Sequence, residues 1–244
     1  MIIFVQIATV FFVGALLGWV VELFFRRIVH KKWINPGFLA GPCLPLYGTG
    51  VLTLYLVCSI DYSFIENDAL RYAFVILLIT FLMTLIEYIT GLVFIKGMKV
   101  KLWDYSDRKG NIQGIICPLF TLFWGLAGAA YYLGVHPFVV SLVQFVALRP
   151  EFSFFTGACF GVFVLDLCYS FRVVGRIRKW ASDHDVVVKM EEFRLSVRLR
   201  AEKFKQKHHF IFSLRGKNGV ENELDSYLGE KTPDAGKKKR AKRG

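Results

Sequence analysis

The stretch WDYSDRKGNIQGIICPLFTLFWG, residues 103–125, joins a charged loop with aromatic side chains to an apolar helix. Pro118 is expected to lie a turn or two inside the start of that helix. A shorter stretch of the same kind, NPGFLAGPCLPLYGTG, covers residues 35–50. Both stretches place polar and proline-containing sequence directly before an apolar run. We therefore expect each of them to lie at a membrane boundary.

The composition of the whole chain is that of a membrane protein. Of its 244 residues, 55% are hydrophobic and 16% aromatic, which is too apolar for an ordinary soluble domain. The net charge is +12, and most of the basic excess follows residue 171. Basic sequence beside apolar spans favours anionic lipid headgroups as a partner and argues against nucleic acid. The five cysteines lie in apolar stretches without CxxC spacing, so buried free thiols are expected.

Five apolar segments are long enough to cross the hydrocarbon core as helices, for which about 20 residues suffice. They cover residues 2–25, 38–60, 72–95, 112–135 and 152–172. The first is expected to be a retained helix and not a signal peptide, because its basic residues follow the apolar run. Residues 137–148 are too few to span and predict an interfacial or re-entrant piece. The predicted fold class is an all-α polytopic membrane bundle over residues 1–173.

The orientation of the bundle is predicted from the basic residues of the short loops. Segments 26–37 and 96–111 are rich in Lys and Arg, whereas 61–71 and 136–151 contribute only Arg71 and Arg149. Because basic loops stay in the cytoplasm, the N-terminus is expected outside and the C-terminus inside.

A basic region follows the last predicted span. Apolar residues recur at helical spacing between Arg and Lys, which predicts a cytoplasmic amphipathic basic helix over residues 174–215. Such a helix could lie on the inner leaflet with its cations on the headgroups, or it could dock against a cytosolic partner subunit. Residues 216–244, which end in KKKRAKR at 237–243, are expected to form a disordered basic tail.

Three acidic residues fall inside the odd-numbered spans. Glu22, Glu87 and Asp166 are expected to face the bundle interior, because ionisable groups in lipid are costly. Glu22 lies one turn above Arg26 and could simply pair with it, and Asp166 is similarly close to the inner boundary. Glu87 lies nine residues above Lys96, or about 13 Å along a helix, so it is the strongest candidate for a substrate or ion pathway.

The even-numbered spans share a proline motif, Pro45-Leu46-Tyr47 and Pro118-Leu119-Phe120. A proline inside a helix frees the carbonyl four residues before it, here those of Gly41 and Gly114. Two helices broken in this way and facing the acids would form a polar pocket open to the cytoplasm. The alternative is that each proline only kinks a packed helix. Within the loop, Asn111 could cap the fourth span, and Asp104 could tie the loop to it.

These motifs resemble a family of membrane proteins, the CmpB-like ABC-transporter type IV family. The resemblance rests on FLAGPCLPLYGTG, LIEYITG and WDYSDRKGNIQG followed by CPLFTLFWG, and it covers about residues 10–130. It implies the membrane-spanning permease subunit of a bacterial transporter in the cell membrane. The motif positions are Glu22, Gly37, Gly41, Pro42, Pro45, Tyr47, Gly48, Glu87, Trp103, Asp104, Tyr105, Asn111, Gly114 and Trp124.

Two functions therefore remain open. In the first, the chain is a transport subunit whose pathway is lined by Glu22, Tyr47, Glu87, Asp104, Tyr105, Asn111 and Asp166. No GxxxxGK[ST] phosphate loop occurs, so a separate ATPase subunit would supply ATP hydrolysis, and a homo-oligomer is a further expectation. In the second, the chain is a membrane scaffold or regulator that binds anionic lipid or a cytosolic partner. No catalytic residue, cofactor or metal site is predicted, because the histidines lack ligand spacing.

Overall fold

The structure, a computed structural model, describes residues 2–207, so the predicted tail and the end of the predicted basic helix lie outside the described residues. About three quarters of the described chain is helical, which confirms the all-α class. Its elements in order are α1 Ile2–His30, α2 Pro45–Cys58, α3 Asp68–Leu92, η1 Val93–Gly97, β1 Val100–Lys101, α4 Pro118–Ala130, η2 Tyr131–Val135, α5 His136–Ala147, α6 Glu151–Asp183, β2 Val188–Lys189 and α7 Met190–Lys207.

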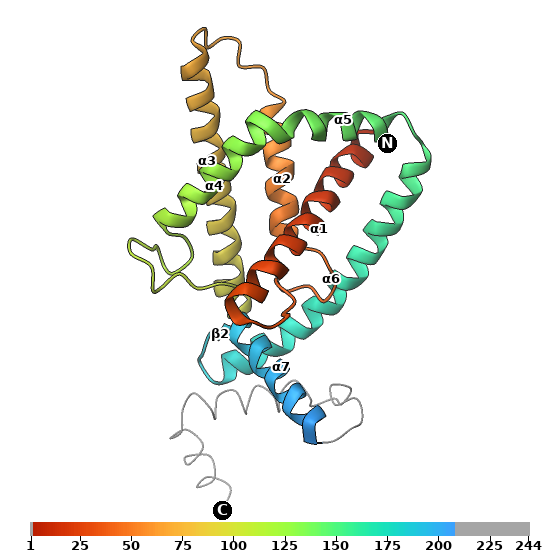
Figure 1. The fold of residues 1–244 in the computed structure, drawn as a ribbon. Helices are drawn as coiled ribbons and strands as arrows, with labels where there is room; N and C mark the ends of the chain where they lie inside the picture. The colour runs from red at the N-terminus through yellow and green to blue at the C-terminus, as the bar shows by residue number, and fades with distance from the viewer. Residues whose placement is uncertain (1, 208–244) are drawn as a thin grey trace, which may run out of the picture.

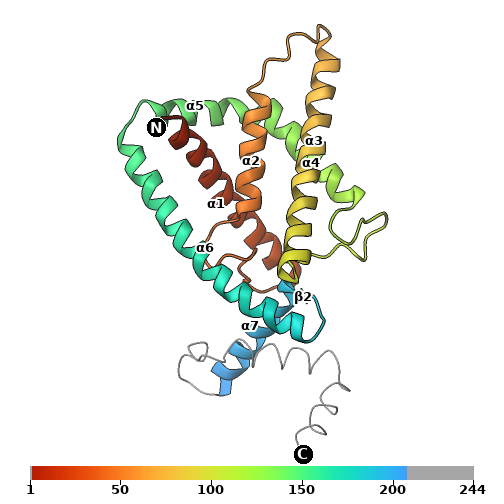
Figure 2. The same cartoon turned by 180° about the vertical axis from the view of Figure 1, so that it is seen from behind.

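The helices form a bundle with two distinct ends. Helices α1, α2 and α3 run side by side, and α5 crosses the end of the bundle at which α1 begins (Figure 1). Strand β2 and helix α7 lie at the opposite end, which the view from behind also shows (Figure 2). Helix α1 packs most extensively against α2, and α6 contacts α1 through aromatic side chains such as Phe11 and Phe163, whose ring centroids are 5.6 Å apart.

Within residues 2–207, four helical stretches are long and apolar enough to cross a membrane: Ile3–Val29, Asp68–Gly97, Pro118–Ala147 and Glu151–Asp183. Their outward surfaces carry many exposed apolar side chains, as expected for helices that contact lipid. The short π-helical turns η1 and η2 continue α3 and α4 without a break. Residues 137–148 were predicted to form a separate interfacial or re-entrant piece. Up to Ala147 they instead belong to the stretch Pro118–Ala147. Figure 1 shows that α5, the last part of this stretch, turns across the end of the bundle.

The predicted span at 38–60 is only partly helical. Helix α2 begins at Pro45 and has 14 residues, or about 21 Å at 1.5 Å per residue, which is shorter than the hydrocarbon core. Residues 31–44 form a non-helical segment before it. Prolines at 36, 42 and 45 explain the difference, because each removes a backbone donor and disfavours helix at the residue before it.

The prediction that Pro45 and Pro118 break helices was wrong. Each is the first residue of its helix, α2 or α4, where a missing N–H costs nothing. The carbonyls that were expected to be freed are bonded: Gly41 accepts from the Cys43 amide at 2.9 Å and Gly114 from the Tyr105 amide at 2.9 Å. The prolines therefore define where the loops end and the helices begin.

The predicted single basic helix over 174–215 is two helices with a turn between them. Helix α6 continues past residue 173 to Asp183, and α7 begins at Met190 after β2. Strands β1 and β2 pair in parallel, with Val100 opposite Val188 and Lys101 opposite Lys189. These elements share an apolar core that is separate from the core of the helical bundle. Its buried members are Val100, Val174, Ile177, Trp180, Ala181, Val188, Met190 and Phe193.

Candidate functional site

A cavity of about 230 Å³ lies near the C-terminal end of α1, where its lining residue Arg26 contacts Glu191 of α7. Helices α1, α2, α3 and α4, the turn η1 and the loops that precede α2 and α4 supply its wall. Two carboxylates, one arginine, two threonines and six aromatic side chains stand among otherwise apolar lining residues. The lining is Glu22, Arg26, Gly37, Phe38, Leu44, Pro45, Leu46, Tyr47, Thr49, Ile86, Glu87, Thr90, Phe94, Leu102, Trp103, Tyr105 and Trp124.

Glu22 lines the cavity from α1 and is paired with a cation. Its Oε1 lies 3.2 Å from Nε of Arg26, one helical turn further along. Its Oε2 accepts a hydrogen bond of 3.0 Å from the hydroxyl of Tyr47 on α2. Arg26 is only 7% exposed and also contacts Glu191 of α7 at 3.2 Å. Glu22 is therefore neutralised within the protein, as the spacing of Glu22 and Arg26 allowed.

Glu87 lines the cavity from α3 and has only neutral hydrogen-bond donors. Its Oε1 accepts from the Tyr105 hydroxyl at 3.0 Å, and its Oε2 accepts from the indole N–H of Trp124 at 2.9 Å. The residue is 3% exposed. Among the residues whose side chains the structure describes, no Lys or Arg forms an ion pair with it. This is the buried carboxylate that the sequence placed deepest.

Tyr105 is held in position for its contact with Glu87. Its ring stacks on Phe120 of α4 with centroids 4.3 Å apart and planes 12° apart. Burial raises the pKa of the Tyr105 phenol well above its usual range, and the nearby charge of Glu87 raises it further. Tyr105 therefore keeps its proton and acts as a hydrogen-bond donor across the physiological pH range.

The loop before α2 is fastened by side chains from distant parts of the chain. Asp166 of α6 accepts hydrogen bonds from the amides of Ala40 and Gly41 at 3.1 and 3.0 Å. Arg194 of α7 donates to carbonyls on the other side of the loop, those of Asn35, Phe38 and Leu39, at 2.6 to 3.3 Å. Backbone groups that lack a helical partner are thus satisfied by one acid and one cation.

Arg194 is a structural cation and not a solvated one. Burial lowers its pKa to about 10, and the neighbouring Arg26 contributes to the decrease. Because the guanidinium spans several carbonyls with its forked donors, helix α7 is tied to the loop that lines the cavity with Gly37 and Phe38. The face of α7 that carries Arg194 therefore contacts the protein's own loop, and the two predicted positions of the basic helix, on the inner leaflet or against a cytosolic partner, concern its other faces.

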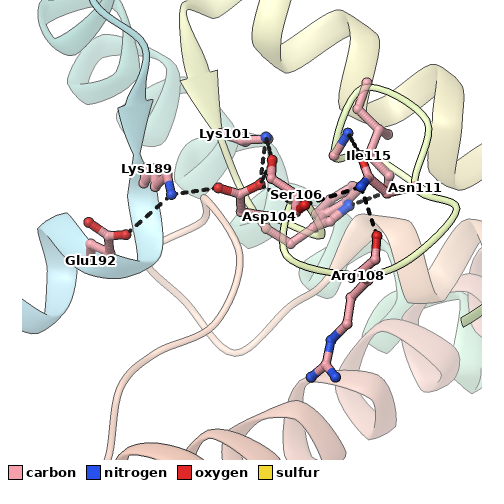
Figure 3. Close-up of polar contacts among 10 residues, drawn as sticks. Lys101, Asp104, Ser106, Arg108, Asn111, Ile115, Lys189 and Glu192 are labelled. Atoms are coloured by element: carbon pink, nitrogen blue, oxygen red, sulfur yellow. Dashed lines mark hydrogen bonds and ion pairs between the residues drawn. The ribbon is translucent and has the colours of Figure 1, made fainter. Parts of the chain in front are cut away.

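The loop before α4 is organised around Asp104 (Figure 3). Its carboxylate contacts the ammonium groups of Lys101 and Lys189, each at 2.6 Å, and accepts from the Ser106 hydroxyl at 2.5 Å. The parallel pairing of β1 and β2 sets the two lysines side by side, so an anion between them offsets their repulsion. Burial alone would raise the pKa of Asp104, but the hydrogen bonds from Lys101, Lys189 and Ser106 together hold it well below its ordinary value.

Asn111 closes the same loop on itself. Its amide donates to the carbonyls of Ser106 and Arg108 at 3.1 and 2.8 Å, and its oxygen accepts from the Gly114 amide at 2.9 Å. Gly114 has φ +66°, a conformation that favours glycine, and an added Cβ would meet Asp104 and its neighbours. Gly37, with φ +72°, plays the corresponding part in the first loop. These turns let each loop fold back toward the helix that follows.

The predicted pathway residues separate into two groups. Glu22, Tyr47, Glu87 and Tyr105 lie together on the cavity wall. Asp166, Asp104 and Asn111 do not line it and instead hold the two loops in place. Of the predicted structural positions, Gly37, Pro45, Trp103 and Trp124 line the cavity, whereas Gly41, Pro42, Gly48, Gly114 and Pro118 do not.

Two kinds of site residue were not singled out from the sequence. Phe38 and Phe94 line the cavity and pack against each other with ring centroids 4.9 Å apart. Nothing in the sequence distinguished them among 24 phenylalanines. Arg194, one of many basic residues beyond the last span, was expected on a charged helix face. The distance in sequence between Arg194 and the loop it binds, about 155 residues, left no local signal.

The cavity presents carboxylate, guanidinium and aromatic side chains to its interior. Within the described residues no group of three or more His, Cys, Asp or Glu side chains could hold a metal ion. The two carboxylates are set in an aromatic wall and receive hydrogen bonds from hydroxyl, indole and guanidinium donors. Such a site can hold a small solute through charge and ring contacts.

The chain belongs to the family described as Putative ABC-transporter type IV, whose model matches residues 9–171. The match covers α1 to most of α6, and therefore every residue of the cavity wall, and it ends before α7. The protein is thus a helical membrane protein of a transporter-like family. No curated protein and no solved structure matches it.

Proposed function

We propose that this chain is the membrane-spanning permease subunit of a transporter, and that solute passes the cavity between Glu22 and Glu87. The family supports the class of protein. The proposed topology has five spans, with α2 completing the bundle, the N-terminus outside and α7 in the cytoplasm, in keeping with the basic loops. The membrane is then the plasma membrane of a bacterium, and the cavity opens toward the cytoplasm.

The observation that carries the proposal is Glu87. A carboxylate that is 3% exposed, within an apolar helix, has only neutral donors and lies on the wall of a cavity. Ionisable groups are retained at such places mainly where they serve a pathway or a binding site. Glu22 has an internal cation and can be explained by structure alone, so Glu87 is the residue on which a pathway role depends.

The proposed energy source is a separate ATPase subunit, with no catalysis by this chain. Helix α7 extends beyond the bundle at the end proposed to be cytoplasmic, with Arg198 and Leu199 exposed on it. The exposed part of α7 is the proposed contact with the ATPase or with anionic headgroups, because its other side is occupied by Arg194 and the loop. A homo-oligomer of this chain remains compatible with that arrangement.

The test uses the full-length protein with an affinity tag, cross-linked in native membranes and then purified. We expect an ATPase carrying a phosphate loop to co-purify with the wild type and with Glu87→Gln alike. After reconstitution, ATP hydrolysis by the complex is expected to fall at least several-fold in Glu87→Gln. The matched control is Glu66→Gln, because Glu66 is exposed in the loop before α3 and lies outside the cavity. It should behave as the wild type.

Two outcomes would contradict the proposal. One is that no ATPase is found with the wild type while a tagged copy of a known transporter in the same membranes yields its own. The other is a Glu87→Gln complex with unchanged thermal stability and unchanged ATP hydrolysis. Leu199→Glu provides a further test of ATPase association. It should release a partner docked on the exposed part of α7 and leave the Arg194 contacts in place.

A second candidate is a non-transporting scaffold or regulator. It is favoured by the fact that both carboxylates already receive hydrogen bonds from the chain itself, two each. On that account the polar groups hold the helix pairs together and α7 binds lipid or a partner. Glu87→Gln would then lower thermal stability and leave any coupled ATP hydrolysis per folded protein unchanged, which separates the two candidates.

A further inference from the structure

The cavity wall carries more negative than positive charge. Glu22 and Glu87 face a single lining cation, Arg26, and Arg26 is shared with Glu191 at 3.2 Å. In the surrounding layer Arg194 is close enough to repel Arg26, and Asp166 offsets Arg194. The balance remains negative when these groups are included. An anionic solute would meet two carboxylates, so the electrostatics favour a cation.

The charge of Glu87 is the part that is not compensated. Its partners, the Tyr105 hydroxyl and the Trp124 indole N–H, are neutral donors. A buried carboxylate without a cation is costly, and a ligand that brings a positive charge offsets that cost. Glu22 differs because Arg26 already supplies the opposite charge. The ligand charge should therefore lie nearer Glu87 than Glu22.

Aromatic rings supply further favourable contacts for a bound cation. Six of them line the cavity: Phe38, Tyr47, Phe94, Trp103, Tyr105 and Trp124. Tyr47 and Trp124 meet edge to face, with centroids 6.1 Å and planes 62° apart, and so form a corner. Phe120 covers one face of Tyr105, which leaves the other face as the one available to a ligand. Ring faces attract cations, most strongly when the cation is a weakly hydrated ammonium in a dry site.

The size and donor set distinguish an organic cation from a metal ion. A cavity of about 230 Å³ is below the usual range for drug-sized ligands, so it fits a compact molecule with few heavy atoms. Metal ions would need several oxygen, nitrogen or sulfur ligands close together, and the described residues contain no group of three or more His, Cys, Asp or Glu side chains that could hold one. An ammonium group needs only one carboxylate and ring faces.

We propose that the cavity binds a small organic cation, a primary to quaternary ammonium compound, with its charge at Glu87 and its alkyl groups against the Tyr47 and Trp124 rings. The inference rests on the proposed function, because it names the class of solute that the permease cavity would take. It makes Glu87 the charge-recognising residue and the aromatic wall the shape-recognising one.

The test compares two probes of the same shape, choline and its uncharged carbon isostere 3,3-dimethyl-1-butanol. Full-length protein in lipid nanodiscs is titrated with each probe, and binding is followed by isothermal titration calorimetry and tryptophan fluorescence. We expect choline to bind at least tenfold more tightly than the neutral isostere. Equal binding of the two probes, or binding of neither, would overturn the inference in the wild type alone, without reliance on any variant.

Variants then locate the contact. Glu87→Gln is expected to weaken choline binding at least tenfold without changing the affinity for the neutral isostere. Tyr47→Phe keeps the ring and should retain choline binding, whereas Tyr47→Leu should lose most of it. Choline binding that is unaffected by Glu87→Gln in folded protein would contradict the assignment.

The outcome is separable from that of the proposed function. If choline binds as expected but no ATPase associates and no coupled hydrolysis is seen, the cation site stands and the permease role fails. If hydrolysis depends on Glu87 but neither probe binds, the permease role stands and the cation inference fails.

Discussion

Glu22 and Glu87 occupy corresponding places in two helix pairs, α1 with α2 and α3 with α4. Their ion-pair and hydrogen-bond partners differ. Glu22 has Arg26 on its own helix and the Tyr47 hydroxyl across the pair. Glu87 has no cation among the described side chains and receives the hydroxyl of Tyr105 and the indole N–H of Trp124. This difference is the reason why the proposed ligand charge is assigned to Glu87 and not to Glu22.

The supporting loops differ in the same way. The loop before α2 is held from outside, by Asp166 of α6 and Arg194 of α7. The loop before α4 is held mostly from within, by Asp104 and Asn111, and Lys189 of β2 also contacts Asp104 (Figure 3). The Glu22 side of the cavity is therefore coupled to α7 more closely than the Glu87 side.

The largest expected effect comes from removing the cation on the Glu22 side. Arg26→Met leaves Glu22 and Glu191 without their shared partner and should lower the free energy of unfolding by about 3–5 kcal/mol, the range for a broken buried ion pair. Thermal unfolding in detergent measures it. Arg27→Met is the control: Arg27 is exposed, so less than about 1 kcal/mol is expected. Equal effects of the two variants would contradict a buried, shared ion pair at Arg26.

Close packing of α1 on α2, and of α3 on the loop before α4, can be compared through glycines. A Cβ at Gly18 would overlap Tyr47, and a Cβ at Gly91 would overlap Ile115, whereas one at Gly157 meets nothing within 4 Å. Gly18→Ala and Gly91→Ala should each destabilise the protein by about 1–3 kcal/mol through overpacking. Gly157→Ala should be neutral or stabilising by up to about 1 kcal/mol. The melting temperatures of the three variants give the comparison, and a pair that tolerates alanine is packed less closely than described.

Removing each tyrosine hydroxyl tests how much the neighbouring glutamate depends on that neutral hydrogen-bond donor. Tyr105→Phe removes one of two donors from Glu87 and should cost about 2 kcal/mol. Tyr47→Phe should cost about 1 kcal/mol, because Arg26 continues to compensate Glu22. Unfolding of each variant at a series of denaturing detergent concentrations would give both changes in the free energy of unfolding. A larger loss for Tyr47→Phe than for Tyr105→Phe would mean that Arg26 does not compensate Glu22.

The smallest effect is expected at the loop before α4. Asp104→Asn should cost about 1 kcal/mol or less at pH 7, since the lysine pairs are partly exposed. The folded protein lowers the pKa of Asp104, so its contribution is present above the unfolded pKa of about 4 and is lost as the pH falls toward the folded value. The difference in melting temperature between wild type and variant should be constant from pH 8 to 5 and narrow below pH 4. Asp107→Asn, at an exposed position in the same loop, should show no such trend.

Local sequence rules predicted the four long apolar helices found in the described part of the chain. Of the seven predicted pathway residues, four line the cavity and three do not. The spacing of Glu22 and Arg26 allowed the ion pair, and the distance of Glu87 from any following basic residue singled it out. The same rules were wrong about the prolines, because a helix that starts at Pro45 or Pro118 and one broken there share the same apolar pattern. They also merged the end of α6 with α7, since the turn at 184–189 interrupts only a few residues of helical spacing.

Asp166 shows most clearly where the sequence interpretation ended. An acid in the inner half of a span predicts either a pathway or a polar contact, and only its neighbours in space decide between them. Here those neighbours are two amides about 125 residues away, in the loop before α2. The roles of Asp104 and Arg194 depended in the same way on segments that the fold brings together.

The sequence by itself determined the membrane class of this protein, its main apolar helices and its family, because length, hydropathy and motif are local properties. Only the tertiary structure decided which acids share a cavity, which have a cation partner and what fastens the loops. The loop contacts join residues more than 100 positions apart, and the hydrogen bonds of Glu22 to Tyr47 and of Glu87 to Trp124 join different helices. The folded structure therefore decides whether a charged residue has a partner.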